Sequence, residues 1–350
     1  MTQQANASLP DLWGQRVDLL GLKLETSPLW PQVETLYKEL SQAGIGFRPP
    51  LYVANEWGCP DGVPIIGVPF YLVDSRFWAL EEQHADDLED SDRILMGLRH
   101  EAGHAVNYAY RLYEEAEWTR LFGNFFAEYD DDYLPCPFSR KHVRHLPGWY
   151  AQKHPDEDFA ETFAVWLTPG LDWKARYSGT EALPKLEYID RLAPRIGHLS
   201  PSVDPSSVTT DPDELAFTVA EFYKRRAEAD GPPVDELRDS LDQDLRELFP
   251  AEGLGIDGAT VTWERRRSIM RTVSNYTGSR MYVVKALLEF LIGRLRVLGV
   301  RAVPGKESDS IIGLTALITM LTSNFLRTRH FVDPAPDAAP RPRPLVGTCP

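Results

Sequence analysis

The segment GLRHEAGHAVN, residues 97–107, carries two histidines four positions apart, with a glutamate directly after the first. Residues four apart on an α-helix point in nearly the same direction, so His100 and His104 would lie on one side of a helix, one turn apart. Two imidazoles placed in this way can occupy two corners of a tetrahedral zinc site. Glu101 points about 100° away and would reach a water on the metal rather than the metal itself. The segment therefore predicts a metal site on a helix.

The residues around this motif predict a long and closely packed helix. Ser91 or Asp92 could cap it, and the helical pattern runs to about Tyr113. Gly97 and Gly103 lie inside the pattern, where each costs about 1 kcal/mol relative to alanine. Such positions are explained if another element, or a substrate, approaches the helix closely.

A third metal ligand has to come from elsewhere in the chain. A metzincin would carry Gly and His further along the same helix, but this sequence has Asn107 and Tyr110 at those two positions. The metzincin pattern is therefore excluded. A carboxylate from a second segment is the alternative.

The segment HPDEDFAETFAVWL, residues 154–167, supplies carboxylates on a second predicted helix of about three turns. Its apolar residues form one sector, and Glu157 and Glu161 lie four positions apart at the edge of that sector. Glu157 would bind the metal, and Glu161 would accept a hydrogen bond from a ligand histidine and so fix its orientation. Two alternatives stay open, namely Asp158 as the ligand and Glu161 as the ligand in place of Glu157.

The two segments together resemble known zinc peptidases. HEAGH, followed 53 positions after His104 by Glu157 in an E-x-x-x-E helix, is similar to the gluzincin branch. The stretch LPGWYAQKHPDEDFAETFAVWL, residues 146–167, resembles the family described as "putative zinc-binding metallopeptidase". Its E-x-x-A-E turn is similar to one in the catalytic domain of anthrax lethal factor. The resemblance covers about residues 50–170 and implies a zincin-like metallopeptidase fold.

The resemblance also implies a role for each residue of these segments. His100, His104 and Glu157 would be the metal ligands, Glu101 the general base, and Glu161 the partner of a ligand histidine. In the lethal-factor-like pattern a tyrosine precedes the ligand glutamate by seven positions, and Tyr150 does so here. Its hydroxyl could donate to the developing oxyanion, although packing under the neighbouring loop is the alternative. Three histidines compete for this role, and the last could instead shape the start of the helix: His142, His145 and His154.

The fold class predicted from the whole chain is α+β. A zincin-like domain, in which a small sheet with an edge strand packs on the motif helix, precedes a mostly helical C-terminal region. Residues 27–43 indicate a helix capped by Ser27, and residues 48–74 indicate strands interrupted by prolines. An edge strand from residues 62–74 could bind a substrate backbone as an added strand.

Domain boundaries follow from composition. We expect a catalytic domain at residues 1–200, a linker rich in Ser, Pro and Asp at 201–213, a helical domain at 214–332 and a disordered Pro-rich tail at 333–350. The helical domain shows helical patterns near residues 213–228, 234–249, 262–276, 280–298 and 308–328.

The composition is that of an acidic globular protein. The formal net charge is −15, which repels nucleic acid and anionic membranes. The first residues carry neither a basic start nor a continuous apolar core, so no secretory leader is expected. The most apolar helical stretch, residues 281–299, carries four charged side chains and is typical of a core helix rather than a membrane span. The three cysteines are widely spaced and predict reduced thiols in a cytoplasmic protein.

These observations favour a zinc-dependent metallopeptidase, with Zn²⁺ as its cofactor and a peptide or protein as its substrate. Glu101 would take a proton from a zinc-bound water as that water attacks the peptide carbonyl. Two other functions stay open. The same centre could serve an amidohydrolase acting on a small-molecule amide, or the helical C-terminal region could bind a protein partner while the zinc site is vestigial.

Overall fold

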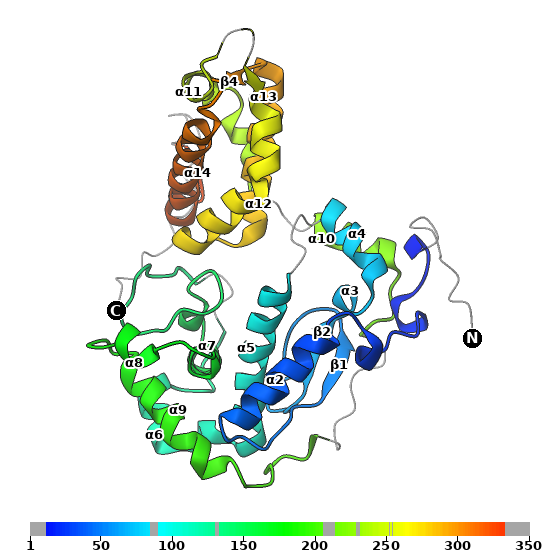
Figure 1. The fold of residues 1–350 in the computed structure, drawn as a ribbon, viewed down its shortest axis with the longest axis vertical. Helices are drawn as coiled ribbons and strands as arrows, with labels where there is room; N and C mark the ends of the chain where they lie inside the picture. The colour runs from blue at the N-terminus through cyan, green and yellow to red at the C-terminus, as the bar shows by residue number, and fades with distance from the viewer. Residues whose placement is uncertain are drawn as a thin grey trace. The chain divides into compact units, whose positions relative to one another are not determined.

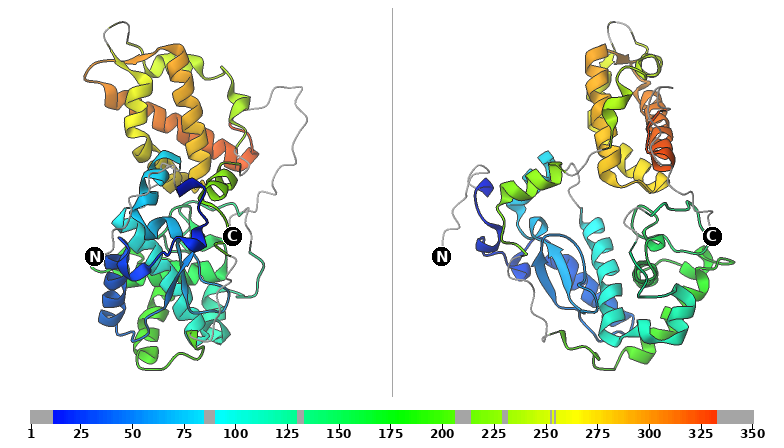
Figure 2. Two further views of the ribbon diagram at one scale, coloured as in Figure 1. Left: turned by 90° about the vertical axis from the view of Figure 1, so that its right-hand side faces the viewer. Right: turned by 180° about the vertical axis from the view of Figure 1, so that it is seen from behind.

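The computed structural model describes residues 12–84, 90–129, 133–205, 214–228, 232–251, 253 and 255–332. The chain forms two compact units. The first comprises Met1–Tyr133, Phe138–Leu146 and Tyr150–Glu228, and the second comprises Leu134–Pro137, Pro147–Trp149 and Ala229–Pro350. Figures 1 and 2 show the elements of both.

The first unit is mostly helical and contains one small sheet, in agreement with the α+β expectation at that level. Its α-helices and strands are α2 (Trp30–Gln42), β1 (Leu51–Ala54), β2 (Ile66–Pro69), α3 (Phe70–Val73), α4 (Ser75–His84), α5 (Ser91–Tyr110), α6 (Ala116–Phe122), α7 (Pro155–Leu167), α8 (Trp173–Arg176), α9 (Leu183–Ile196) and α10 (Val219–Glu228). Short 3-10 helices lie at Val17–Leu19, Leu24–Thr26, Leu112–Glu114 and Tyr150–Gln152.

The motif helix α5 is capped one residue earlier than expected. The Asp90 side chain accepts a hydrogen bond from the backbone N–H of Arg93, so neither Ser91 nor Asp92 is the cap. The helix ends where Arg111 adopts a left-handed conformation with φ of 50°. The expected end near Tyr113 is therefore wrong by three residues, because the left-handed residue stops the helical hydrogen bonding.

Helix α2 also begins later than its predicted start. Ser27 does not cap it, because the Ser27 hydroxyl donates to the carbonyl of Leu24 at 2.5 Å. The helix begins at Trp30, with Pro31 in its first turn, where the missing N–H of proline has no cost.

The sheet consists of two parallel strands. Leu51 pairs with Ile66, and the register continues to Ala54 opposite Pro69. The other side of β2 is closed at Gly67, whose N–H donates to the carbonyl of Gly58 at 2.7 Å. All four residues of β2 are buried. The expectation of an open edge strand within residues 62–74 is therefore wrong for β2, because the chain after β1 folds back against it.

Helix α5 lies in the centre of the first unit. It packs against α7 on one side and against α2 and the sheet on another (Figure 1). A Cβ atom on Gly103 would lie 2.7 Å from the Cα of Ala160 in α7, and a Cβ on Gly97 would lie 3.4 Å from the ring of Trp57. Both glycines therefore stand where another element approaches the helix, as their positions in the sequence predict.

Helix α10 belongs to the first unit, whereas the sequence placed residues from 214 onward in the C-terminal domain. The reason is aromatic packing: the rings of Phe217 and Phe222 lie 6.0 Å and 4.8 Å from that of Phe70. In addition, Arg226 of α10 forms a salt bridge of 3.0 Å with the buried carboxylate of Glu81 in α4.

The second unit is a bundle of helices with an apolar core. Its elements are a 3-10 helix at Val234–Leu237, α11 (Asp242–Leu248), β3 (Ile256–Asp257), α12 (Gly258–Thr277), α13 (Met281–Leu298), β4 (Arg301–Ala302) and α14 (Glu307–Thr328). Strands β3 and β4 form an antiparallel pair. Helices α12, α13 and α14 pack side by side and supply most of the core (Figure 2).

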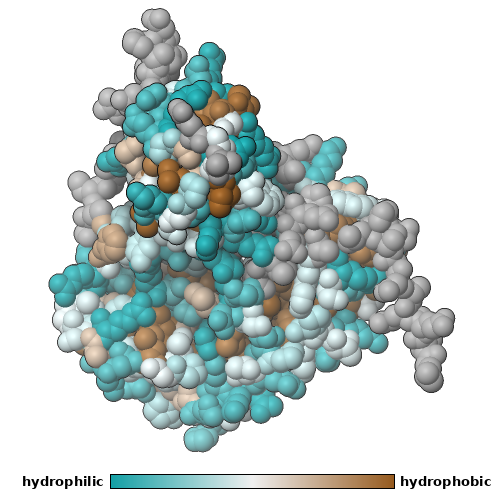
Figure 3. Space-filling view, turned by 45° about the horizontal axis from the view of Figure 1, so that its top comes forward, coloured by the Kyte–Doolittle hydropathy of each residue, from teal (hydrophilic) through white to brown (hydrophobic). Residues whose placement is uncertain are grey.

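Two findings bear on the cellular setting expected from the sequence. Among the described residues one helix, α14, is long and apolar enough to cross a membrane by length and composition. The C-terminal helices show hydrophobic surface in Figure 3. Cys59 is a free thiol.

Candidate metal centre

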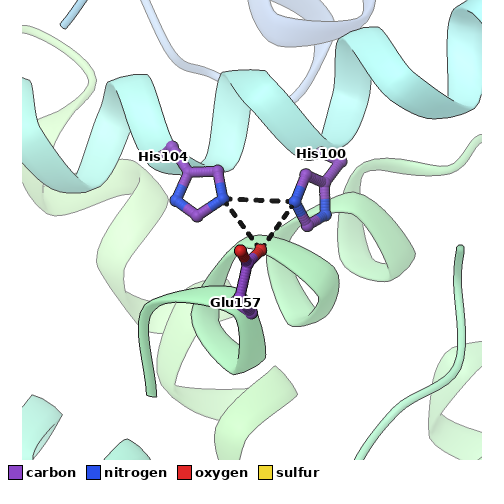
Figure 4. A group of neighbouring side chains, drawn as sticks. All are labelled: His100, His104 and Glu157. Carbon is purple, nitrogen blue, oxygen red and sulfur yellow. Dashed lines mark hydrogen bonds and ion pairs between the residues drawn. The ribbon is translucent and has the colours of Figure 1, made fainter. Parts of the chain in front are cut away.

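Three side chains from α5 and α7 converge on one point (Figure 4). The Nε2 atoms of His100 and His104 lie 3.1 Å apart, and Oε2 of Glu157 lies 3.0 Å from the first and 3.2 Å from the second. All three side chains are buried, and their ligand atoms lie within 4.8 Å of one another. The spacing of four within α5 places the imidazoles one turn apart, and α7 brings the carboxylate across from them.

The charges of these three groups are strongly coupled. Burial alone would lower the pKa of His100, but its hydrogen bonds to the carboxylates of Glu157 and Glu161 raise that pKa to about 9. Burial likewise opposes the protonated form of His104, yet the carboxylates of Asp156 and Glu157 hold its pKa well above the ordinary value. Burial favours protonated Glu157, but the two imidazoles hold its pKa far below the ordinary value. The carboxylate and the two imidazoles therefore favour each other's charged forms, and a cation would compete with protons for the same atoms.

Glu161 orients the first histidine. The Nδ1–H of His100 donates to Oε1 of Glu161 at 3.1 Å, which leaves Nε2 directed at Glu157. Glu161 itself is fully buried and accepts hydrogen bonds from the backbone N–H groups of His145 and Leu146 at 2.9 Å and 3.0 Å. The Glu161 carboxylate is thus held by His100 on one side and by the loop before α7 on the other. A carboxylate held in this way orients a metal-binding imidazole and raises its basicity.

Asp156 orients the second histidine, and the sequence analysis missed it. The Nδ1–H of His104 donates to Oδ2 of Asp156 at 2.7 Å, and the hydroxyl of Tyr108 donates to the same oxygen at 2.5 Å. The side-chain amide of Asn107 donates to Oδ1 at 2.7 Å. The available signal was the H-x-x-N-Y continuation of the motif, which places a second and a third hydrogen-bond donor on α5 near the start of α7.

Glu101 lies beside the convergent group without joining it. Its side chain is buried, and among the described residues its Oε2 atom has no hydrogen-bond partner. Burial raises the pKa of the Glu101 carboxyl, and the neighbouring imidazoles oppose this. The thiol of Cys59 donates to the backbone carbonyl of Glu101 at 3.3 Å and so holds the chain after β1 against α5.

Tyr150 faces the centre from the 3-10 helix that precedes α7. Its ring centroid lies 5.6 Å from that of His100. Burial raises the pKa of the Tyr150 phenol, and the nearby carboxylates of Glu157 and Glu101 raise it further. Tyr150 is therefore a neutral hydroxyl donor beside the convergent group.

The three competing histidines have other partners. The Nε2–H of His145 donates to the carbonyl of Met96 at 3.0 Å. The Nδ1 atom of His154 caps α7 by accepting from the N–H of Asp156, while its Nε2–H donates to Ala127. The Nε2 atom of His142 lies 3.9 Å from the carboxylate of Asp158.

Asp158, the alternative ligand from the sequence, is directed away from the convergent group. Its Oδ2 atom pairs with Nζ of Lys185 in α9 at 2.5 Å, and the same Nζ donates to the carbonyl of Lys141 at 2.8 Å. Burial raises the pKa of Asp158 to about 6 against the opposing charge of Lys185. This ion pair ties α7 to α9 and to the loop that holds Glu161.

The donor set fits a zinc ion. Two imidazole nitrogens and one carboxylate oxygen are the ligands of known catalytic zinc sites that leave a coordination position open. The buried, unpartnered Oε2 of Glu101 is explained if a polar group such as a water stands next to it. Within the described part of the chain the cluster consists of these three residues.

Comparison with known proteins supports a zinc site in one part of the chain. The profile of a family described as "Putative zinc-binding metallo-peptidase" matches residues 78–174, which include α5 and α7. Neither a curated protein nor a solved structure matches this chain.

Proposed function

We propose that this protein is a zinc-dependent metallopeptidase of the gluzincin type, with His100, His104 and Glu157 as its metal ligands. The observation that carries this proposal is the convergence of two Nε2 atoms and one carboxylate oxygen beside the unpartnered oxygen of Glu101. The match to a zinc-binding peptidase family across these same helices supports it.

A zinc ion held by these ligands would supply Lewis-acid chemistry that lowers the pKa of a water and polarises a carbonyl oxygen. The protein itself would orient the two ligand histidines before a metal ion binds. Asp156 and Glu161 each accept the Nδ1–H of one ligand histidine, so both imidazoles keep the tautomer whose Nε2 atom is free to bind.

Glu101 is the general base of the proposed reaction. It accepts a proton from the attacking water as the new carbon–oxygen bond forms, and then delivers that proton to the amine nitrogen as the carbon–nitrogen bond breaks. Its burial serves this role, because a raised pKa brings a carboxylate closer to the range in which it can both accept and return a proton.

Tyr150 is proposed to donate a hydrogen bond to the oxygen that becomes negatively charged. Its position beside His100 and its neutral hydroxyl support this role. His145 and His154 are weaker candidates, because their ring N–H groups donate to backbone carbonyls.

The substrate is proposed to be an extended peptide. Since β2 offers no open edge, the segment around Gly58 is the candidate for pairing with a substrate backbone. It lies between β2 and α5, with the ring of Trp57 near Gly97 and the thiol of Cys59 on the carbonyl of Glu101.

The test is a comparison of wild type with Glu101→Gln, both loaded with zinc and incubated with a peptide library. We expect the variant to bind zinc as wild type does and to lose about 10²–10⁴-fold in hydrolysis. Equal cleavage by both proteins would refute the mechanism. Cleavage of small amides but of no peptide would favour the amidohydrolase, and zinc binding without hydrolysis of either would favour a vestigial site.

A further inference from the structure

Helix α14 is apolar on two opposite faces. One face packs into the core of the second unit through Leu314, Ile318, Leu321 and Phe325. On the other face Ile312 and Met320 are 68% and 55% exposed. The most apolar stretch of the helix is long enough to cross a membrane, yet only 28% of that stretch is buried. A helix that is apolar all round is normally covered all round, so the outer face of α14 lacks an occupant.

Charged and apolar residues follow one another in a regular order along the outer face of α14. At 100° per residue, Asp309, Ile312, Ala316, Met320 and Arg327 all lie within about 40° of the direction of Ala316. All five are exposed. The face is thus an apolar stripe with an acidic side chain at its N-terminal end and a basic side chain at its C-terminal end.

Two polar residues, Ser323 within the stripe and Thr319 at its edge, do not oppose its burial. The hydroxyl of Thr319 donates to the carbonyl of Thr315 at 2.7 Å, and that of Ser323 donates to the carbonyl of Thr319 at 2.8 Å. Both hydroxyls are satisfied within the helix. Covering this face would therefore leave neither of them without a hydrogen bond.

We propose that the outer face of α14 binds the same face of a second copy of this chain, in an antiparallel pair related by a two-fold axis at the level of Ile318. Asp309 and Arg327 lie nine residues on either side of Ile318, so Asp309 comes opposite Arg327 of the partner subunit. Ala316 and Met320 lie two residues on either side, so the large Met320 comes opposite the small side chain of the partner's Ala316. The stripe is self-complementary in charge at its ends and in size at its centre, as a two-fold interface requires, while Ile312 comes opposite Asn324 of the partner subunit.

A membrane is the less suitable occupant. The inner face of α14 forms the core of the bundle, so the helix could span a bilayer only if the second unit came apart. Helices that lie on anionic membranes carry Lys and Arg along their polar face, whereas Glu307 and Asp309 stand at one end of this helix. Opposite charges at the two ends favour an antiparallel copy instead. This proposal is independent of the metal centre.

The test is sedimentation velocity of the full chain over a wide concentration range. We expect wild type to dimerise and Met320→Glu to raise the dimer Kd by at least about 100-fold, since it places two charges in the centre of the interface. Asp309→Arg alone and Arg327→Asp alone should each raise the Kd by about tenfold or more, because like charges then oppose each other. The double variant should restore the dimer.

The matched control is Val297→Glu on α13, which is 73% exposed and lies off the stripe, and which should dimerise as wild type does. Circular dichroism of each variant separates loss of the interface from loss of the fold. A wild type that stays monomeric at all concentrations overturns the proposal, as does a monomer that binds phosphatidylglycerol vesicles. A double variant no tighter than the single ones overturns the antiparallel register.

Discussion

Helices α5 and α7 of the first unit and helices α12 to α14 of the second are both long and closely packed, but they bury opposite kinds of side chain. Between α5 and α7 the buried residues include seven ionisable side chains: His100, Glu101, His104, Asp156, Glu157, Asp158 and Glu161. In the bundle the core is built from Leu, Ile, Val and Phe, and the buried polar side chains of α12 and α14 are hydroxyls: Thr262, Ser274, Thr277, Ser310 and Thr322.

The difference shows what the packing of each unit requires of its buried side chains. Burying a charge is costly unless an opposite charge or a hydrogen bond offsets it, so every buried acid of α7 requires a specific partner. That requirement fixes the position of α7 relative to α5, because each buried acid has to keep its contact with its partner. The bundle has no such requirement in its core, and its distinctive residues lie outside, on the exposed face of α14.

The largest contrast is expected from removing a charge in one region and a side chain in the other. Glu157→Gln should abolish stoichiometric zinc binding and hydrolysis, because an amide oxygen is a poor substitute for the carboxylate between two imidazoles. Leu288→Ala, in the core of the bundle, should cost about 2–5 kcal/mol of stability and leave the zinc content unchanged. Metal analysis after dialysis and urea denaturation measure the two effects. Full zinc occupancy in the first variant would contradict the ligand set.

The second contrast concerns helix glycines. Gly103→Ala should destabilise the protein by about 1–3 kcal/mol, because the added Cβ would lie 2.7 Å from the backbone of Ala160 and force α5 and α7 apart. Gly293→Ala in α13 meets nothing within 4 Å and should instead stabilise by about 0.5–1 kcal/mol. Denaturant unfolding checks both, and two changes of the same sign would mean that α5 and α7 are less tightly packed than described.

The third contrast lies within α7 itself. Asp156→Asn should weaken zinc binding by about 10–100-fold, since the partner of His104 Nδ1 loses its charge. Asp158→Asn should reduce stability through the lost pair with Lys185 while changing zinc affinity less. Competition with a fluorescent chelator gives the affinities. If Asp158→Asn has the larger effect on affinity, Asp156 is not the residue that orients His104.

The last prediction concerns pH and the metal-free protein. The pKa of His100 in the folded protein is about 9, above its ordinary value of 6.5. Protonated His100 therefore stabilises the metal-free fold fully below pH 6.5, and this contribution disappears as the pH rises through about 9. The Tm of the metal-free protein should fall by several degrees over that interval, whereas zinc-loaded protein should not follow the same curve. A flat profile without metal would show that His100 is not held by Glu157 and Glu161.

The metal centre was predictable from the sequence to the extent that it depends on helical periodicity. The spacing of four between His100 and His104 and the position of Glu157 on a second helix led to the group that converges in the structure. The role of Asp156 could not be derived in the same way. Its direction depends on the rotation of α7 about its own axis, which is fixed by the contact between Gly103 and Ala160.

Features that depend on contacts without a periodic sequence pattern could not be predicted from the sequence either. The loop that supplies the N–H groups of His145 and Leu146 to Glu161 has no repeating pattern to reveal its path. The burial of β2 depends on the chain folding back at Gly58, and the packing of α10 on the first unit depends on aromatic rings more than a hundred residues away in the chain.

The four acidic residues in the first two turns of α7 also tie this helix to three other parts of the first unit. Asp156 and Glu157 depend on α5, Asp158 depends on Lys185 of α9, and Glu161 depends on the backbone of the loop before α7. Until those elements arrive, the carboxylates repel one another and keep their hydration shells. The burial of α7 therefore depends on contacts to all three of these elements, and no acid of α7 is offset by α7 alone.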